Sequence, residues 1–311
     1  MASTDQAPGA AGIAPVAGRF EFVVGRYAGP DRSISCDGLV LGAALDLTHW
    51  EGNNTPQEFR ADTSTEIALL FVQSAAAETW RGAVAVNNHF DTDGILAVWT
   101  LLSPAEALAR RDRIVAAAEV GDFEEWPSDP HAIRIDAALR ALGEDSCDDA
   151  SAYARALALL PGLIDDVDAR SDLWGEHWTR LEEAERDLAA GRIRIERRGT
   201  TAIARHAPGI EEVPGPLLSR EAREARRLLL AFESPGGGFS YRYERPRYAW
   251  AVTVRRPPIA APDAAAMLAR LGSPWGTRGA IGMTAIVATN EPVTMDPMDA
   301  AEALERAEAG L

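Results

Sequence analysis

Short apolar runs alternate with longer helix-like stretches along the first part of the chain. Runs of strand-forming residues predict strands at residues 20–25, 38–47 and 82–87. Capping signals and apolar stretches that follow polar turns predict helices at residues 62–74, 94–102 and 104–120, with a strand at 67–72 as the alternative to the first. The second of these helices begins directly after a polar turn that follows a buried strand.

The same alternation continues to the C-terminus. Strands are predicted at residues 192–197, 200–205, 241–245, 248–254 and 280–289. Helices are predicted at residues 145–170, 173–191, 219–232, 261–271 and 300–309. Strands that alternate with helices favour an α/β fold, with a mainly parallel sheet flanked by helices. The C-terminal part reads as a smaller, mixed α/β module.

Three segments follow from this pattern. Residues 1–18 are rich in Ala, Gly and Pro and lack a solid apolar block, so we expect a disordered tail rather than a signal peptide. Residues 19–190 form the expected α/β domain that carries a metal site. Residues 191–311 form the smaller α/β domain, with a substrate-binding or capping role.

The charge of the chain limits the kinds of binding partner that we expect. The formal net charge is −16 and the pI is about 4.8, so the chain is repelled by nucleic-acid backbones and anionic lipids. We expect a small anionic substrate, no long duplex nucleic acid and no membrane, and a homodimer is compatible with the composition. The two cysteines, Cys36 and Cys147, have no metal-binding spacing and suit a reducing, cytoplasmic location.

The densest chemical pattern is the string Asn88-His89-Phe90-Asp91-Thr92-Asp93-Gly94, directly after the predicted strand at 82–87. Ligands bind at the carboxyl ends of strands in open α/β sheets, and alternate residues there point the same way. One imidazole and two carboxylates suit Mn²⁺, Zn²⁺ or Fe²⁺. The alternative is a β-turn with an aspartate helix cap and an incidental histidine.

This string, between an apolar strand and an apolar helix, resembles the first motif of the DHH phosphoesterase superfamily. The resemblance implies a pair of divalent ions, usually Mn²⁺, with Mg²⁺ or Zn²⁺ as alternatives. It implies that His89 and Asp91 bind one ion and Asp93 the other. The string also resembles that of a bacterial family with an HFDTDG-type motif, which implies no function.

The resemblance further implies a bridging aspartate at the end of a later strand, for which Asp122 is the best match. The family's Asp-His-His triplet and its glycine-rich GGGH motif are missing. His49, which follows an apolar run together with Asp46, is the main candidate for the missing ligand. His131 in Asp129-Pro130-His131 is the other candidate.

Substrate-binding residues are sought where polar groups cluster near such a site. His49 and Asn53 lie in one dense polar segment, and Arg245 and Arg255 flank an aromatic strand. Arginine and aromatic side chains hold phosphates and stack bases. The alternative for the arginines is a half-buried strand with a charged face, and for His49 it is a histidine packed beside Trp50.

The sequence therefore predicts a divalent-metal-dependent hydrolase that acts on a phosphoester or phosphoanhydride of a small anionic or nucleotide-like substrate. His89, Asp91, Asp93 and Asp122 are its expected catalytic residues and, with His49, its metal ligands. A metallopeptidase or amidohydrolase that uses Glu124 and Glu125 is one alternative. A non-catalytic module that binds a metal or another ligand is the other.

Overall fold

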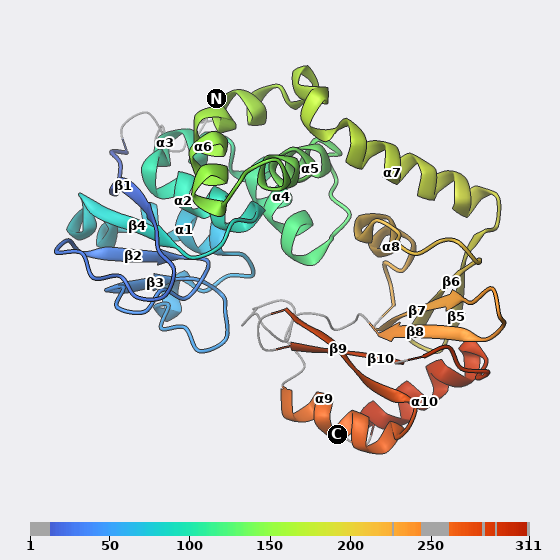
Figure 1. The fold of residues 1–311 in the computed structure, drawn as a ribbon. Helices are drawn as coiled ribbons and strands as arrows, with labels where there is room; N and C mark the ends of the chain where they lie inside the picture. The colour runs from blue at the N-terminus through green and yellow to red at the C-terminus, as the bar shows by residue number, and fades with distance from the viewer. Residues whose placement is uncertain (1–12, 226, 244–260, 282–283, 290, 310–311) are drawn as a thin grey trace, which may run out of the picture. The chain divides into compact units, whose positions relative to one another are not determined.

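The computed structural model describes residues 13–225, 227–243, 261–281, 284–289 and 291–309 (Figure 1). The chain divides into two compact units. Unit 1 comprises residues 1–122 and 127–175, and unit 2 comprises residues 123–126 and 176–311. The division falls inside helix α7 (Ser171–Ala189), whereas the sequence analysis placed the boundary after this helix.

A sheet of four parallel strands forms the centre of unit 1. The strands are β1 (Ala17–Phe22), β2 (Ser33–Cys36), β3 (Leu45–Leu47) and β4 (Ala83–Asn87). Their order in the sheet is β1-β4-β2-β3, as Figure 1 shows. All five residues of β4 are buried, as expected for an apolar strand inside a parallel sheet.

The strands predicted at residues 20–25 and 38–47 differ in their bounds from the observed strands β1 (Ala17–Phe22) and β3 (Leu45–Leu47). Val16 and Ala17 are buried, and β1 begins at Ala17, so the expected tail is too long by its last residues. Residues 1–12 of that tail lie outside the described residues. The apolar run at 38–47 contains only β3, because Gly42, with φ +83°, turns the chain within the run.

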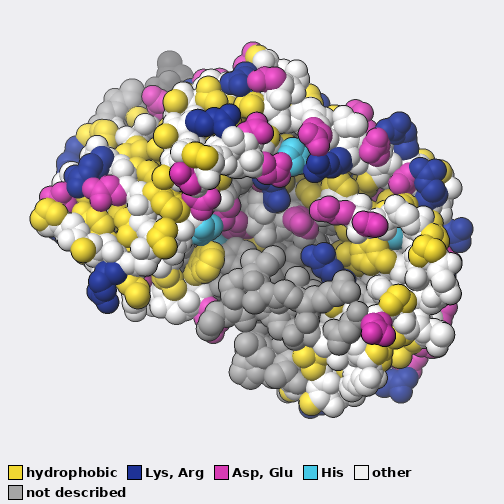
Figure 2. All heavy atoms as spheres, viewed as in Figure 1, with side chains coloured by type: hydrophobic (Ala, Val, Ile, Leu, Met, Phe, Trp, Pro, Cys, Tyr) yellow, Lys and Arg dark blue, Asp and Glu magenta, His cyan; other side chains and the backbone are white. Residues whose placement is uncertain are grey.

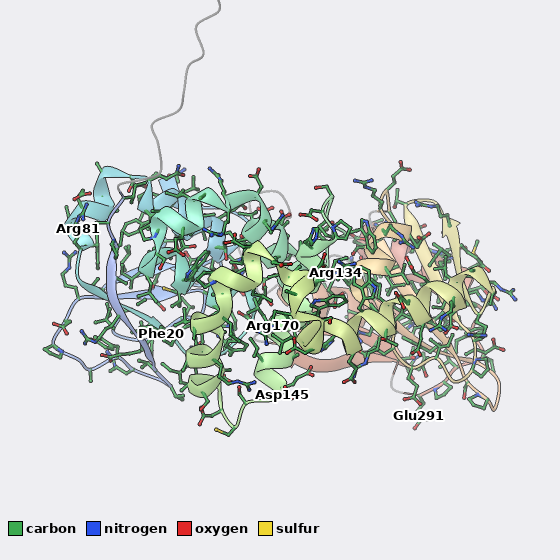
Figure 3. The ribbon with its side chains drawn as sticks, turned by 90° about the horizontal axis from the view of Figure 1, so that it is seen from above. Phe20, Arg81, Arg134, Asp145, Arg170 and Glu291 are labelled. Carbon is green, nitrogen blue, oxygen red and sulfur yellow. The ribbon has the colours of Figure 1, made fainter. Side chains whose placement is uncertain are left out.

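Helices pack against this sheet and against one another. Their bounds are η1 (Gln57–Phe59), α1 (Ser64–Val72), η2 (Ala75–Trp80), α2 (Thr92–Leu102), α3 (Pro104–Ala109), α4 (Arg111–Phe123), α5 (His131–Glu144), α6 (Asp149–Asp165) and η3 (Val167–Arg170). Helix α2 contacts β1, β2 and β4, and α1 contacts α2 and β3. Aromatic packing links the sheet to α6. The ring centroid of Tyr153 on α6 lies 4.3 Å from that of Phe20 on β1, and Phe20 is labelled in Figure 3.

The start of α1 follows the expected capping signal. Thr63 is the N-cap, and its hydroxyl accepts a hydrogen bond of 3.2 Å from the backbone N–H of Glu66. Ser64 and Thr65, the first two residues of the helix, are fully buried. Their backbone N–H groups therefore need partners inside the protein.

Unit 2 contains a six-stranded mixed sheet. Its strands are β5 (Ile193–Arg198), β6 (Thr201–His206), β7 (Arg227–Glu233), β8 (Phe239–Tyr243), β9 (Trp275–Ile281) and β10 (Thr284–Thr289), in the order β5-β6-β7-β8-β10-β9. Only β6 and β7 pair in parallel. Helices α9 (Ala261–Leu271) and α10 (Pro297–Ala309) contribute Met267 and Leu304 to the core of this unit.

The predicted helix at 219–232 is wrong. This segment forms the end of the short helix α8 (Gly215–Glu221) and then strand β7. Leu228, Leu229 and Leu230 are helix formers, but they are buried and lie in a strand that pairs with β6 on one edge and β8 on the other. The predicted strand at 248–254 lies outside the described residues.

The predicted α/β fold class is confirmed, with a parallel sheet in unit 1 and a mixed sheet in unit 2. Among the described residues, no helix combines the length and apolar character needed to cross a membrane. On the face seen in Figure 2, acidic and basic side chains are interspersed rather than gathered into one basic patch.

Candidate metal centre

Three neighbouring parallel strands of unit 1 end at the same edge of the sheet. Asp37 directly follows β2, His49 follows β3 after one residue, and the string from Asn88 to Asp93 follows β4. Because β4, β2 and β3 are adjacent in this order, side chains far apart in the sequence meet at this edge.

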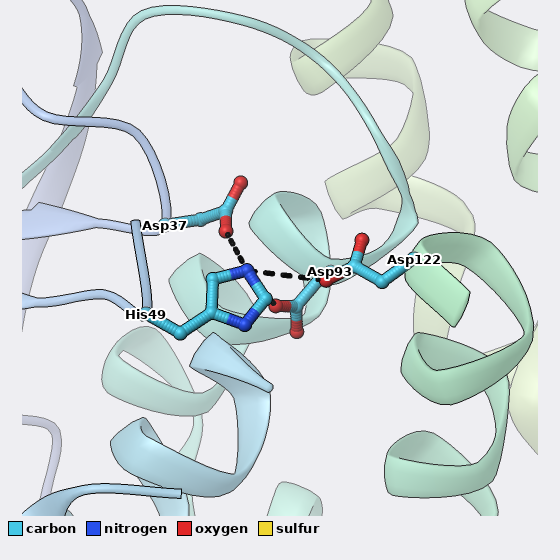
Figure 4. A group of neighbouring side chains, drawn as sticks. All are labelled: Asp37, His49, Asp93 and Asp122. Atoms are coloured by element: carbon cyan, nitrogen blue, oxygen red, sulfur yellow. Dashed lines mark ion pairs between the residues drawn. The ribbon is translucent and has the colours of Figure 1, made fainter. Parts of the chain in front are cut away.

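The first ligand group consists of Asp37, His49, Asp93 and Asp122 (Figure 4). Nε2 of His49 lies 3.5 Å from Oδ1 of Asp37, 3.8 Å from Oδ2 of Asp93 and 3.3 Å from Oδ2 of Asp122. The four side chains are at most 5% exposed. Three carboxylates this close and this deeply buried require a cation or protons between them.

The second ligand group consists of Asp37, His89 and Asp91. Nε2 of His89 lies 2.9 Å from Oδ2 of Asp37 and 3.0 Å from Oδ2 of Asp91. Asp37 therefore belongs to both groups, with one oxygen facing each histidine. The side chains of His89 and Asp91 are 27% and 38% exposed, so solvent reaches the second group more easily than the first.

In both histidines, Nδ1 lies near an oxygen on one side of the ring and Nε2 faces the carboxylates on the other, as in metal-binding histidines. Nδ1 of His49 lies 2.5 Å from the carbonyl oxygen of Asp62, and Nδ1 of His89 lies 2.9 Å from Oδ1 of Asn88. An Nδ1–H that donates to an oxygen leaves the lone pair on Nε2, which is the atom that faces the carboxylates in each group. Outer hydrogen bonds of this kind are the usual support of metal-binding imidazoles.

The distances between ligand atoms fit a shared ion. Two atoms that each lie about 2.1 Å from an ion, at angles of roughly 90–120°, are about 3.0–3.6 Å apart. The contacts of His49 and His89 with Asp37, Asp91 and Asp122 span 2.9–3.5 Å, and the contact of His49 with Asp93 is longer, at 3.8 Å. The four carboxylates of the two groups carry a charge of −4, which two divalent ions balance.

Asp93 is held by the N-terminus of α1. Its Oδ2 accepts a hydrogen bond of 2.6 Å from the backbone N–H of Ser64, and its Oδ1 accepts one of 2.8 Å from the N–H of Thr65. These bonds satisfy two donors at the start of a buried helix and favour negative charge at Asp93. They also set the position of its carboxylate beside His49.

The protein environment shifts the pKa values of this cluster in opposite directions. Burial raises the pKa of Asp37, but hydrogen bonds with His49 and His89 outweigh it and bring the pKa well below its usual range. Burial lowers the pKa of His89, yet Asp91 and Asp37 raise it to about 11. In the absence of an ion, a proton on His89 therefore balances part of the negative charge of this cluster.

The remaining carboxylates of the first group have raised pKa values. Burial and then the charge of Asp37 raise the pKa of Asp93 to about 6. Burial, followed by the charges of Asp93, Asp91 and Asp37, raises the pKa of Asp122 well above its usual value. Oδ2 of Asp122 is buried and lies 3.3 Å from Nε2 of His49. A proton shared with Asp93, or a cation, would relieve the repulsion among these carboxylates.

An amide network holds the turn that carries His89. Oδ1 of the buried Asn87 accepts hydrogen bonds from the backbone N–H groups of Gly38 and Asn88, and its Nδ2 donates to the hydroxyl of Tyr153. The side chain of Asn88 donates to the carbonyl of Leu39. These bonds tie the loop after β4 to the loop after β2, which positions His89 opposite Asp37.

The predicted ligands are distributed over both groups. The structure places His89 and Asp91 in one group, and Asp93, Asp122 and His49 in the other. Asp122 lies in the last turn of α4 rather than at a strand end, because residues 111–123 are helical. The shared position, which the sequence analysis gave to Asp122, is occupied by Asp37.

Asp37 was missed because β2 is only four residues long, which is too short for the alternating Ser33-Ile34-Ser35-Cys36 to stand out as a strand. The available signal is a carboxylate between this short alternating segment and Gly38. A turn explains that string equally well from sequence alone.

The other candidates lie outside the two groups. His131 pairs with Asp129 and Asp168 at a side-chain exposure of 38%. The side chain of Asn53 bonds within its own loop, to Trp50 and Thr55. Arg245 and Arg255 lie outside the described residues. Glu124 and Glu125, named for the peptidase alternative, belong to unit 2.

The comparisons with known proteins place the chain in a family. Residues 19–275 match the model of a family described as "Family of unknown function (DUF6687)". The chain belongs to this family. The match covers β1 from Arg19 onward, β2 to β4, all residues of both ligand groups, and unit 2 as far as Trp275. No curated protein and no solved structure matches the chain.

Proposed function

We propose that this protein is a hydrolase that uses two divalent metal ions, Mn²⁺ in the first place, and acts on a phosphoester or phosphoanhydride. The observation that carries the proposal is the pair of ligand groups that share Asp37, each with a histidine whose Nε2 faces carboxylates. Two ions that share a carboxylate are a recurrent arrangement in phosphoryl-transfer enzymes.

The donor set fits such ions. Asp37, His49, Asp93 and Asp122 offer three carboxylates and one imidazole to one ion, and Asp37, His89 and Asp91 offer two carboxylates and one imidazole to the other. Mixed oxygen and nitrogen ligands suit Mn²⁺ and Zn²⁺ better than Ca²⁺. When bound, such ions lower the pKa of water and stabilise the charge that develops on phosphoryl oxygens.

The chain's own residues divide the work. Asp37 would hold both ions, and the buried group with His49 would hold one of them away from solvent. The more exposed group with His89 and Asp91 is the side on which a substrate has room. The resemblance of the string from His89 to Gly94 to the first DHH phosphoesterase motif supports the same chemistry. The two free cysteines suit the cytoplasmic location proposed with it.

The test is metal content and turnover of the full-length protein. After dialysis against Mn²⁺, elemental analysis is expected to give about two ions per chain. A panel of bis-p-nitrophenyl phosphate, p-nitrophenyl phosphate and pyrophosphate is expected to include at least one substrate. His89→Ala is expected to lose one ion and the activity.

His131→Ala is the matched control, because His131 also lies between two aspartates but outside both ligand groups. It is expected to keep metal content and turnover. A folded wild-type protein without bound divalent ions would refute the proposal. Turnover of acyl-amide rather than phosphate substrates would favour the peptidase alternative, and metal binding without any turnover would favour a binding module.

A further inference from the structure

A cavity of about 380 Å³ adjoins the second ligand group and shares Asp91 with it. Its walls come from the residues around the start of α2, the last turn of α4, helix α5 and the start of α6, all in unit 1. Cavities of this size hold small organic ligands. Because Asp91 is also the most exposed of the ligands, the cavity lies on the side from which a substrate reaches the centre.

Among the described residues that line this cavity, Arg140 is the single cationic one. Its Nε donates to Oδ2 of Asp136 at 2.8 Å, and its Nη2 donates to the carbonyl of Gly121 at 3.1 Å. Asp136 is only 6% exposed, and its other oxygen accepts a 2.6 Å hydrogen bond from the hydroxyl of Thr92. The guanidinium is therefore held in one orientation beside the residue that follows Asp91.

These bonds leave Nη1 of Arg140 without a hydrogen-bond partner among the described residues. A planar guanidinium held in place is a good donor to phosphoryl oxygens. If Arg140 served only to pair with Asp136, its guanidinium would not need to lie at the wall of a cavity beside the ligand groups. The position suits a contact with a phosphoryl group bound at the ions.

The rest of the lining indicates what else the ligand carries. Glu144 and Asp149 are exposed carboxylates at this cavity, and Phe90 adds an apolar ring. Oδ2 of Asp149 accepts a hydrogen bond of 3.2 Å from the backbone N–H of Phe90, which leaves Oδ1 for a ligand. Carboxylates accept hydrogen bonds from hydroxyl and amino groups and repel additional free anions. A ligand with one phosphoryl group and several hydrogen-bond donors fits this lining better than one with several phosphates.

We infer that this cavity binds the alcohol part of a phosphoester whose alcohol is rich in hydroxyl or amino groups, with Arg140 donating to a phosphoryl oxygen. The inference rests on the proposed function, since it places the phosphoryl group at the two ions. It makes Arg140 a substrate-binding residue and Asp149 a residue that selects for the alcohol.

The first experiment titrates inorganic phosphate into the Mn²⁺-loaded protein by calorimetry. Arg140→Gln is expected to weaken phosphate binding at least about tenfold, with metal content unchanged. Arg140→Lys, which keeps the charge beside Asp136, is expected to fall between this variant and the wild type. Arg134→Gln is the control, because Arg134 also lies on α5 and also pairs with an aspartate, Asp168 of η3, but does not line the cavity.

Phosphate binding by Arg140→Gln and Arg140→Lys equal to that of the wild type would overturn the role of Arg140 and leave the metal centre intact. A wild-type protein that takes up no Mn²⁺ would instead contradict the proposed function itself. Melting temperatures of all variants separate loss of binding from loss of folding. Arg140→Lys remains informative if Arg140→Gln does not fold.

The second experiment compares glycerol 1-phosphate with n-propyl phosphate, which has the same carbon chain without hydroxyl groups. Glycerol 1-phosphate is expected to bind at least about fivefold more tightly, and Asp149→Ala is expected to remove that difference. Equal or tighter binding of n-propyl phosphate to the wild type would overturn the inferred substrate class.

Discussion

Nε2 of His89 lies 2.9 Å from Oδ2 of Asp37, and this contact joins the ends of the neighbouring strands β4 and β2. Since the other oxygen of Asp37 faces His49, the carboxylate connects the two ligand groups. Loss of Asp37 should therefore affect both groups, whereas loss of any other ligand should affect one.

The first prediction concerns metal stoichiometry. Asp37→Asn keeps the size of the side chain but removes its charge and one of its two oxygens, so binding of both ions is expected to fail. Asp91→Asn disturbs only the second group and is expected to retain about one ion per chain. Elemental analysis after gel filtration measures both. Equal metal content in the two variants would show that Asp37 is not shared.

The second prediction concerns the stability of the metal-free protein. Asp122 is a buried carboxylate surrounded by Asp93, Asp91 and Asp37, so Asp122→Asn relieves repulsion at little cost in packing. In EDTA at pH 8 the variant is expected to be more stable than the wild type by about 1–2 kcal/mol. In Mn²⁺ the order is expected to reverse, because the variant lacks a ligand. Urea unfolding in both buffers checks this, and a variant that is less stable in EDTA as well would contradict it.

The third prediction links a helix cap to the metal centre. Thr63→Ala removes the cap of α1 and is expected to lower the free energy of unfolding by about 1 kcal/mol. Because the first N–H groups of α1 hold Asp93, the variant is also expected to bind Mn²⁺ more weakly. Thr63→Ser, which retains a capping hydroxyl, should restore both properties. Failure of Ser to restore them would mean that the methyl group of Thr63, rather than its hydroxyl, matters.

The fourth prediction compares two helical glycines. A Cβ at Gly94 would lie 2.5 Å from Nδ2 of Asn87 and 2.9 Å from Oδ1 of Asp91, whereas a Cβ at Gly162 meets no atom within 4 Å. Gly94→Ala is therefore expected to lower the melting temperature and the metal content. Gly162→Ala, inside α6, is expected to add about 0.5–1 kcal/mol of stability. Thermal unfolding and elemental analysis measure the stability and metal content of both variants. Similar effects of the two substitutions would contradict the close packing around Gly94.

The fifth prediction concerns pH. His206 is 1% exposed and stacks on Phe232, and burial lowers its pKa to about 4. Its folded-state pKa lies below the unfolded value of about 6.5, so the unfolded state binds more protons as the pH falls. The stability is therefore complete above pH 6.5 and decreases toward pH 4, by about 3 kcal/mol from this residue.

His206→Phe removes this titration and retains the ring stacking. The difference in unfolding free energy between wild type and variant should change by that amount between pH 7 and pH 4, as measured by urea unfolding. A difference that does not depend on pH would show that His206 is not held neutral in the folded protein.

Local sequence determined much of the fold. The Thr63 cap, the apolar run of β4 and the polar turn before α2 are all encoded within a few neighbouring residues, and each was predicted close to its observed position. The error at β7 has the opposite origin. A run of leucine and alanine suits a helix and a buried strand equally, and pairing with β6 and β8, which lie elsewhere in the sequence, decides between them.

In the candidate site, too, some residues are grouped by the local sequence and others only by the tertiary structure. His89, Asp91 and Asp93 lie within five residues after one strand, so the sequence alone brought them together as a group of ligands. Only the tertiary structure added Asp37 and placed His49 and Asp122 beside Asp93. The order β4-β2-β3 is a property of the whole sheet, whose strands come from separate parts of the sequence. No local pattern around Asp37 encodes which strand end will lie next to its own.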